Sequence, residues 1–306
     1  VGAVVTPSGD PLTLLLLSTL LIGWTLGYRL VETVLFAIAL LLWSEPLSSD
    51  LRVGNVNALQ VGGVALYLLL RRPPVPLWKD IGGGFLLGAL VAFKPTLALV
   101  PGLLALAWAL DGRWRTLLVQ AGAAAAGVAV AFLVGCEFLG SWSAWGDWLS
   151  SLSGLERVSD ISLALGNFSI TRAVAETSGL DVGPLLLIAV VTGTGFVLFW
   201  TRPRPDAENP AAVFERDLAV TALGCAVSVV ALKLVWLHYY MLLLPLTLYV
   251  LRPRPVQQGW RRAVDWVGWL AFLAVLGRPV VALLGMQTTM GWVLIYVPGA
   301  WALLLL

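Results

Sequence analysis

The sequence predicts an all-α integral membrane protein that crosses the bilayer many times. Of its 306 residues, 59% are hydrophobic and only 12% are charged, which is about half the usual charged share. The apolar residues recur in long runs from one end of the chain to the other. In lipid, such runs must form helices, because each helix satisfies its own backbone hydrogen bonds. The composition excludes an ordinary cytosolic enzyme and a disordered chain.

Each apolar run that ends at polar, Gly or Pro residues is expected to be one helix. In order, the expected helices cover residues 11–28, 31–44, 55–70, 81–93, 96–110, 116–136, 182–200, 218–236, 238–251, 264–278 and 288–306. Several are shorter than the ~20 residues of a full crossing. The pairs 81–93/96–110 and 218–236/238–251 are therefore expected to be broken or re-entrant helices that line a cavity. The fold class is a bundle of about 9–11 transmembrane or re-entrant helices, forming one transmembrane domain over 1–306.

Basic clusters set the expected orientation in the membrane. They lie at 71–79, 113–115, 202–216 and 252–262, and an even number of expected helices separates each from the next. The positive-inside rule assigns these loops to the cytoplasm. With Arg29, this side holds 13 Lys and Arg residues against 5 on the other. The prediction is a multi-pass protein of the cell membrane.

The longest polar stretch, 137–181, is expected outside the cytoplasm. Trp142, Trp145 and Trp148 recur at a helical spacing, which predicts an amphipathic helix on the membrane surface. A second helix is predicted over 169–178, with Ser169 as its N-cap and Gly179 as its stop.

Unusual polar residues gather on this same expected outer side. They are Asn55 and Asn57 before the third helix, Lys94 at a Pro break, Asn167 and Ser169 in the outer loop, and His238 and Tyr239 at the last break. A lysine well inside apolar sequence is costly and indicates function. Simpler interpretations remain open: the asparagines could cap helices, the lysine could extend to the interface, and the histidine could be an interfacial aromatic. Together the residues predict a polar pocket at the outer mouth of the bundle.

Several other chemistries have no support in the sequence. The two cysteines, Cys136 and Cys225, lie in separate apolar runs, so neither a disulfide framework nor a zinc site is expected. No metal site or cofactor is predicted. The basic loops lack interleaved aromatics, so no nucleic-acid partner is expected. Glycine spacings that involve Gly63 and Gly83 indicate helix packing at most.

The ordered polar groups resemble glycosyltransferase family 87 of the GT-C superfamily. Ser44-Glu45-Pro46 followed by Gly54-Asn55-Val56-Asn57 resembles the family's Pro and Gly-Gln-x-Asn, although Asn55 stands where Gln is usual. Gly88 through Lys94-Pro95 resembles its Gly-x-x-x-x-x-Lys-Pro. The segments Asp111–Arg115, Gly166–Ser169 and Trp236–Tyr240 resemble its basic turn, its Gly-Asn-Gln-Ser loop and its Trp-x-His-His/Tyr-Tyr element. The likeness covers about 40–250.

The resemblance implies a GT-C-like bundle and a glycosyl transfer from a polyprenyl-phosphate sugar, mannose above all, to a lipid or glycan acceptor. Cations and hydrogen-bond donors stabilise a departing phosphate, so we expect His238, the catalytic candidate, and Lys94 to bind it. The other residues expected to bind substrate are Asn55, Asn57, Asn167, Ser169 and Tyr239. The donor is a substrate, so no cofactor is implied; the other partners are membrane lipids. The family's proposed general-base Asp lies in a first outer loop, and this chain, which begins Val-Gly-Ala, is expected to start after it. The general base is therefore not identified in this chain.

An external polar site agrees with this interpretation. Nucleotide sugars are cytoplasmic, so an external transferase needs a donor that is carried across the membrane on a lipid. The alternatives are a polytopic transporter or lipid flippase, which usually binds its substrate near the bilayer midplane, and a non-catalytic membrane assembly subunit.

Overall fold

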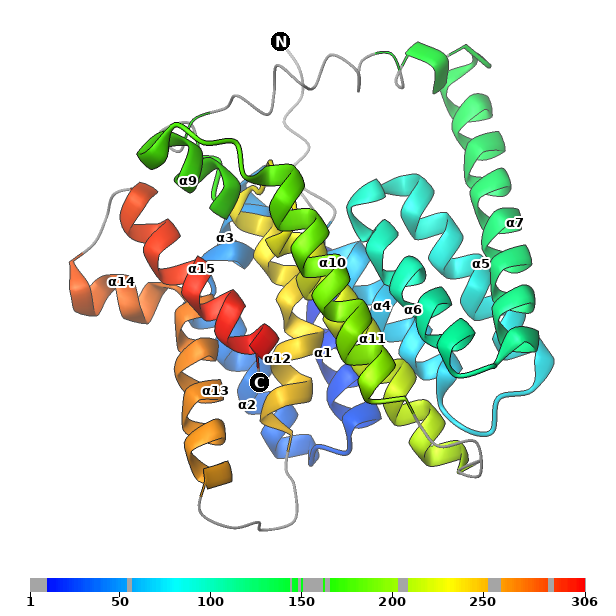
Figure 1. The fold of residues 1–306 in the computed structure, drawn as a ribbon, viewed down its shortest axis with the longest axis horizontal. Helices are drawn as coiled ribbons and strands as arrows, with labels where there is room; N and C mark the ends of the chain where they lie inside the picture. Colours follow the sequence, from blue (N-terminus) through cyan, green and yellow to red (C-terminus); the bar gives the residue numbers. More distant parts are fainter. Residues whose placement is uncertain are drawn as a thin grey trace. The chain divides into compact units, whose positions relative to one another are not determined.

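In the described part of the chain, the regular elements of the computed structural model are all helices, and one isolated antiparallel bridge joins Ser44 and Gly277. It describes residues 10–53, 57–143, 145–147, 150, 162, 166–202, 209–252, 260–285 and 289–305. The elements, shown in Figure 1, are α1 (Asp10–Leu26), α2 (Leu30–Trp43), α3 (Glu45–Val53), α4 (Asn57–Arg71), α5 (Leu77–Phe93), η1 (Pro95–Ala98), α6 (Leu99–Leu110), α7 (Trp114–Leu139), α9 (Ile170–Ser178), α10 (Gly183–Trp200), α11 (Pro210–Val230), η5 (Leu237–Leu243), α12 (Leu244–Leu251), α13 (Trp260–Leu276), α14 (Arg278–Leu284) and α15 (Thr289–Leu305).

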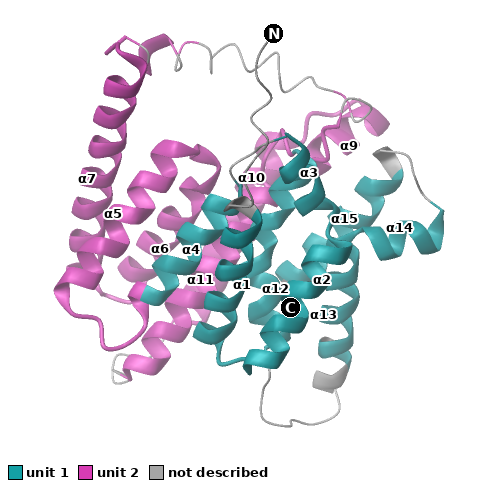
Figure 2. Ribbon diagram, turned by 180° about the vertical axis from the view of Figure 1, so that it is seen from behind, with its two compact units in different colours: residues 1–69, 236–306 teal, residues 70–235 magenta. Residues whose placement is uncertain are grey.

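These helices form two compact units, which Figure 2 shows in teal and magenta. Unit 1 joins the two ends of the chain, Val1–Leu69 and Trp236–Leu306, and unit 2 is the continuous stretch Leu70–Val235. The single transmembrane domain over 1–306 stays a prediction.

Unit 1 is built around aromatic and aliphatic side chains at the junction of its two chain segments. In its core α13 packs on α15 and on α12, and α1 packs on α2 and on α12. The hydroxyl of Tyr28 donates to the carbonyl of Leu248 at 2.7 Å, which ties the α1–α2 turn to α12. Tyr67 and Tyr296 are fully buried, so the burial of large rings supplies much of this unit's apolar contact.

Unit 2 depends on glycine for its closest helix pair. A Cβ on Gly88 of α5 would collide with the carbonyl of Ala124 in α7, and one on Gly84 would lie 2.6 Å from the carbonyl of Gln120. Gly127 of α7 meets the carbonyl of Phe85 in the same way. Small residues at such positions let two backbones approach closely in a membrane. The sequence interpretation had singled out Gly63 and Gly83 instead.

Most expected helices appear within a few residues of their predicted ranges. Two described helices, Trp114–Leu139 and Gly183–Trp200, are long and apolar enough to cross a membrane, and a third candidate is the bent pair α3 and α4, whose axes differ by 117°. The remaining apolar helices in the described part of the chain are shorter. An all-helical membrane fold is therefore confirmed, while the number of about 9–11 spans stays a prediction.

Both predicted helix breaks are present. Lys94 is extended, with φ −149° and ψ 103°, between the end of α5 and the start of η1. The second break is longer than expected, because α11 ends at Val230 rather than near 236 and the 3-10 helix η5 begins only at Leu237. α11 also begins early, at Pro210, because the side chain of Asn209 accepts the N–H of Ala211 at 3.0 Å and caps it.

Two short helices, α3 and α14, were not predicted from the sequence. Each has fewer than ten residues, so neither produces an apolar run of the length that identifies a membrane helix. An ion pair connects the two helices: the guanidinium Nε of Arg278 in α14 lies 2.6 Å from Glu45 Oε2 in α3.

Candidate functional site

The predicted outer loop is held by a polar clamp, formed by Asn167 and Ser169 on the backbone of residues 233–235. Asn167 is fully buried; its side-chain nitrogen donates to the carbonyl of Lys233 at 3.1 Å, and its oxygen accepts the N–H of Val235 at 3.1 Å. The Ser169 hydroxyl donates to the same Lys233 carbonyl at 2.7 Å. The clamp gives hydrogen-bond partners to backbone groups of residues 233 and 235, which lie beyond the end of α11 at Val230.

Ser169 also performs the capping role that the sequence predicts. Its side-chain oxygen accepts the N–H of Arg172 at 3.1 Å, and α9 ends at Gly179, which has φ +73°. The helix predicted over 169–178 is thus confirmed. The tryptophan stripe is only partly described: Trp145 donates to the carbonyl of Phe132 at 3.0 Å, Trp142 is exposed, and Trp148 lies outside the described residues.

The clamp places the side chain of Lys233 on an exposed face. Its Nζ lies 2.7 Å from Asp181 Oδ2, and its side chain passes so close to Gly183 that a Cβ there would lie 2.6 Å from Lys233 Cε. The hydrogen bond from Lys233, then that from the N–H of Gly183, lowers the pKa of the Asp181 carboxyl. The sequence interpretation placed Lys233 inside a helix; the structure places it in the non-helical break.

Lys94 occupies the other break in unit 2. Its backbone N–H donates to the carbonyl of Leu90 at 2.9 Å, and its carbonyl accepts the N–H of Leu97 at 3.3 Å. The backbone of Lys94 therefore ends one helix and begins the next, and its side chain is partly exposed.

Unit 1 contains the other described candidates. Asn57 is fully buried and donates to Asp50 Oδ1 at 2.8 Å, and Asp50 is itself 1% exposed. α3, which carries Asp50, packs against η5, which carries His238 and Tyr239. Asn55 lies outside the described residues.

His238 is almost entirely buried, at 6% exposure, and meets the ring of Tyr239 edge-on at 5.1 Å between centroids. Tyr239 is half-buried, and the next residue, Tyr240, packs on Tyr296 at 4.9 Å. The 3-10 turn thus places a histidine and a tyrosine at adjoining positions beside α3.

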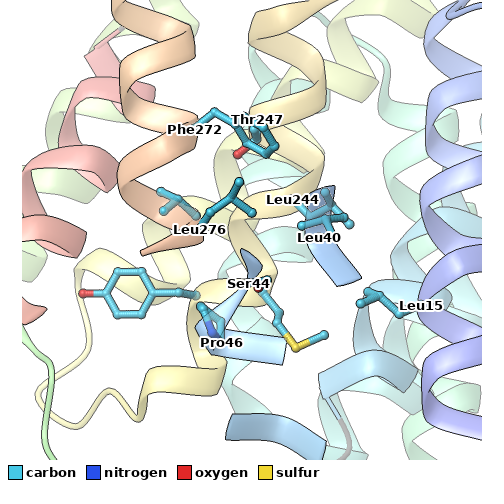
Figure 3. Close-up of a pocket in the computed structure, with 11 residues that line it drawn as sticks. Leu15, Leu40, Ser44, Pro46, Leu244, Thr247, Phe272 and Leu276 are labelled. Atoms are coloured by element: carbon cyan, nitrogen blue, oxygen red, sulfur yellow. The ribbon is translucent and has the colours of Figure 1, made fainter. Parts of the chain in front are cut away.

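An apolar pocket adjoins this turn inside unit 1 (Figure 3). Tyr240 and Met241 of η5, together with Leu244 and Thr247 of α12, line one side of it. The remaining lining residues come from α1, α2, α3 and α13 and from the link at Ser44: Leu15, Leu40, Ser44, Pro46, Phe272, Val275 and Leu276. The walls are mostly apolar, and the volume of the pocket is about 20 Å³, roughly the room that one water molecule needs.

The structure brings together some of the sequence-predicted residues. Asn167 and Ser169 meet in the clamp of unit 2, and Asn57 lies beside the helix that packs on the turn with His238 and Tyr239 in unit 1. The convergence of these groups with Lys94 in one outer pocket stays a prediction. Among the described residues, no three His, Cys, Asp or Glu side chains gather at one point.

Sequence reasoning missed a buried ion cluster at the predicted cytoplasmic ends of the unit 2 helices. Asp217 accepts from Arg71 at 2.7 Å, from Arg113 at 2.7 Å and from Trp108 at 2.9 Å. Arg71 also pairs with Asp80. Arg71 is 4% exposed and Asp217 only 1%. Side chains that had been assigned to solvated loops therefore form buried ion pairs that connect α4, α6, α11 and the start of α7. The signal was a charged residue, Asp217, next to an apolar run.

Comparisons with known proteins place the chain in a family. The model of glycosyltransferase family 87 matches residues 10–232. A polyprenol-phosphate-mannose-dependent alpha-(1-2)-phosphatidylinositol pentamannoside mannosyltransferase from Mycolicibacterium smegmatis (strain ATCC 700084 / mc(2)155) is 28% identical over 245 residues, which cover 79% of this chain and 53% of that relative. The chain therefore spans about half the length of the relative. No solved structure matches it. By the extent of the family match, the chain belongs to glycosyltransferase family 87.

Proposed function

We propose that this chain transfers a sugar, mannose first among the candidates, from a polyprenyl phosphate to a lipid or glycan acceptor outside the cytoplasm. The observation that carries the proposal is the family match over residues 10–232. The printed name of the relative, which is dependent on polyprenol-phosphate-mannose, supports the choice of donor. The broken helices at Lys94 and at 231–236 support a site that is built into the bundle.

The reaction would be a single displacement at the anomeric carbon. The acceptor oxygen forms a bond to that carbon, the bond from the carbon to the phosphate oxygen breaks, and the electron pair leaves with the polyprenyl phosphate. A base takes the proton of the acceptor hydroxyl. The leaving group carries its own negative charge, so cationic and hydrogen-bonding side chains lower the barrier.

Lys94 and His238 are the residues that we assign to the lipid phosphate. Lys94 is a cation at a helix break, where its backbone is held on both sides, and His238 is supported by its contact with Tyr239. In this proposal the donor is a substrate and no resident cofactor takes part.

Asn57 and Tyr239 are proposed to bind the substrate in unit 1. Asn55 is proposed for the same role on the basis of the sequence alone. Asp50 would orient the amide of Asn57 through the 2.8 Å hydrogen bond. Asn167 and Ser169 are proposed to act chiefly by shaping the segment 233–235, because their described hydrogen bonds go to that backbone and to their own loop.

Two lysines, one in the first turn of α5 and one at its C-terminal end, give a matched test of the site. Lys94→Ala should lower mannose transfer from polyprenyl-phosphate mannose by about 100-fold or more, which is the usual cost of removing a group that stabilises a leaving charge. Lys79→Ala, at the opposite end of α5, should stay near the wild-type rate. Transfer is measured in membranes with a radiolabelled donor, and membrane insertion of each variant is measured in parallel. Wild-type turnover in Lys94→Ala would remove the assigned role.

A further inference from the structure

The link between α13 and α14 holds α3 in place through a small bracket within unit 1. The α3 bracket consists of Ser44, Glu45, Ser48, Gly277 and Arg278. An isolated antiparallel bridge joins Ser44 to Gly277. The Nε of Arg278 lies 2.6 Å from Glu45 Oε2, and its Nη2 donates to the Ser48 hydroxyl at 2.7 Å. One backbone link and two side-chain links therefore tie α3 to residues that lie 230–233 positions away in the sequence.

The α13–α14 link is a rigid base for this bracket. Gly277 has φ +77°, in the region that residues with a side chain rarely adopt, and a Cβ there would collide with the Tyr296 hydroxyl. Tyr296 is fully buried and stacks on Trp292, with ring centroids 5.7 Å apart and planes 12° from parallel. Both rings belong to α15, which packs on α13. Because close-packed side chains enclose the link, Arg278 projects from a backbone that has little room to move.

α3 is a short helix that depends on such contacts. It has nine residues, of which three are buried. Isolated helices shorter than about 12 residues are marginal, so the position of α3 is set by its neighbours. The Glu45 side chain, 12% exposed, pairs with the guanidiniums of both Arg278 and Arg52. Arg52 belongs to α3 itself, so of these two ion pairs the one with Arg278 connects α3 to another helix.

α3 in turn supports residues that we assign to substrate binding. Its buried Asp50 accepts a hydrogen bond from the side chain of Asn57 at 2.8 Å. α3 also packs against η5, the turn that carries His238. A second connection runs through Tyr240 of η5, which packs at 4.9 Å on Tyr296, the ring that encloses the α13–α14 link. The link therefore supports η5 from two sides, through α3 and through the buried tyrosine.

We propose that Arg278 is a positioning residue for the donor: by holding α3, it keeps Asn57 and the turn with His238 in the arrangement that binds the polyprenyl-phosphate sugar. This role rests on the proposed function, and it falls to a residue beyond the stretch 10–232 that the family model matches. When only a fraction of the molecules has α3 in place, the apparent affinity for the donor falls by that fraction. Once the donor is bound the site is complete, so the loss affects KM rather than kcat.

The two arginines on one carboxylate give a matched comparison of transfer kinetics. In Arg278→Gln, the KM for polyprenyl-phosphate mannose should rise about tenfold while kcat stays within about twofold of the wild type, as expected when a minority of the molecules is competent to bind. Arg52→Gln is the control, because Arg52 Nη2 lies 2.5 Å from Glu45 Oε1 within the same helix. Its KM should equal that of the wild type.

A conservative variant separates the bracket from a general loss of stability. Arg278→Lys keeps the charge that faces Glu45 but lacks the planar fork that reaches both Glu45 and Ser48, so its KM should lie within about threefold of the wild type. A KM that is unchanged in Arg278→Gln, or that rises equally in Arg52→Gln, would overturn the proposal.

A distance measurement tests the bracket without the use of activity. Nitroxide labels are attached at Val53→Cys of α3 and Leu283→Cys of α14, since these two residues are 60% and 84% exposed and both native cysteines are buried. Electron–electron double resonance should give a narrow distance distribution in the wild-type background and in Arg52→Gln, and a broader one in Arg278→Gln. Equal widths in all three would overturn the proposal. Absence of sugar transfer by the wild type, with the distribution still broadened in Arg278→Gln, would instead contradict the proposed function and with it the donor role of Arg278, while the hold of Arg278 on α3 would stand.

Discussion

At the scale of single residues, the clamp shows how a residue can shape a site without facing a substrate. The sequence pointed to Asn167 and Ser169 through their pattern, and the structure gives both residues backbone partners 64–68 positions away. Side chains that bond a distant backbone are needed wherever a helix stops inside an apolar region. Their pattern was predictable from sequence, but these partners were not, because sequence spacing does not reveal contacts so far apart.

The exposed pair of Lys233 and Asp181 predicts a specific response to acid. The pKa of Asp181 is lowered below its ordinary value of 3.8, so this carboxyl group loses its proton more readily in the folded protein than in the unfolded chain. This contribution to stability is present above pH 3.8 and is lost as the pH falls through the lower folded value. The thermal midpoint of Asp181→Asn should therefore lie below that of the wild type at neutral pH, and the two should converge below the ordinary carboxyl value.

The same pair provides its own control. In a Lys233→Gln background, the effect of Asp181→Asn should become smaller, because the largest cause of the lowered pKa is absent. A difference between wild type and Asp181→Asn that stays constant as the pH falls would show that the ion pair is not its source.

At the scale of helices, we expect a side chain added at the close α5–α7 contact to destabilise the protein, because it would force the two backbones apart. Gly88→Val places a branched side chain against the carbonyl of Ala124, and overpacking of this kind costs typically about 1–3 kcal/mol or more. Gly122→Ala on the same α7 is the control, since a Cβ there meets nothing within 4 Å. Denaturation in detergent micelles should show a large loss for the first variant and almost none for the second; equal effects would contradict the packing account.

The ion cluster predicts a similar contrast between buried and accessible charge. Asp217→Asn leaves Arg71 and Arg113 without their shared carboxylate, and breaking a buried pair costs about 3–5 kcal/mol. Glu176→Gln removes an i,i+4 partner of Arg172 on α9, which should cost about 0–1 kcal/mol. Chemical unfolding of both variants measures the difference, and a small loss for Asp217→Asn would show that the cluster does not hold the helices together.

At the scale of the whole molecule, the apolar runs predicted the helices well and the connections poorly. α2, α7 and α9 begin and end within three residues of their predicted bounds, because each is flanked by a turn or capping signal. α3 and α14 were missed because they are short. Arg71 and Arg113 were assigned to solvated loops, since burial of a charge depends on a partner far along the chain.

The order and spacing of the polar motifs identified the family, although none of them is specific alone. The family match over residues 10–232 confirms that resemblance. The position of the site outside the cytoplasm and the identity of the sugar rest on charge asymmetry and on the relative's name, and both are part of the proposed function.

The most direct measurement of the central proposal is sugar transfer by the protein in sealed membrane vesicles of known orientation, with radiolabelled polyprenyl-phosphate mannose and a lipid or glycan acceptor. We expect label to enter the acceptor when donor and acceptor are supplied on the face opposite to the Arg-rich loops, and we expect no label from GDP-mannose supplied alone. Transfer only on the face with the Arg-rich loops would contradict the external site. Translocation of the intact donor without any transfer would instead favour a flippase.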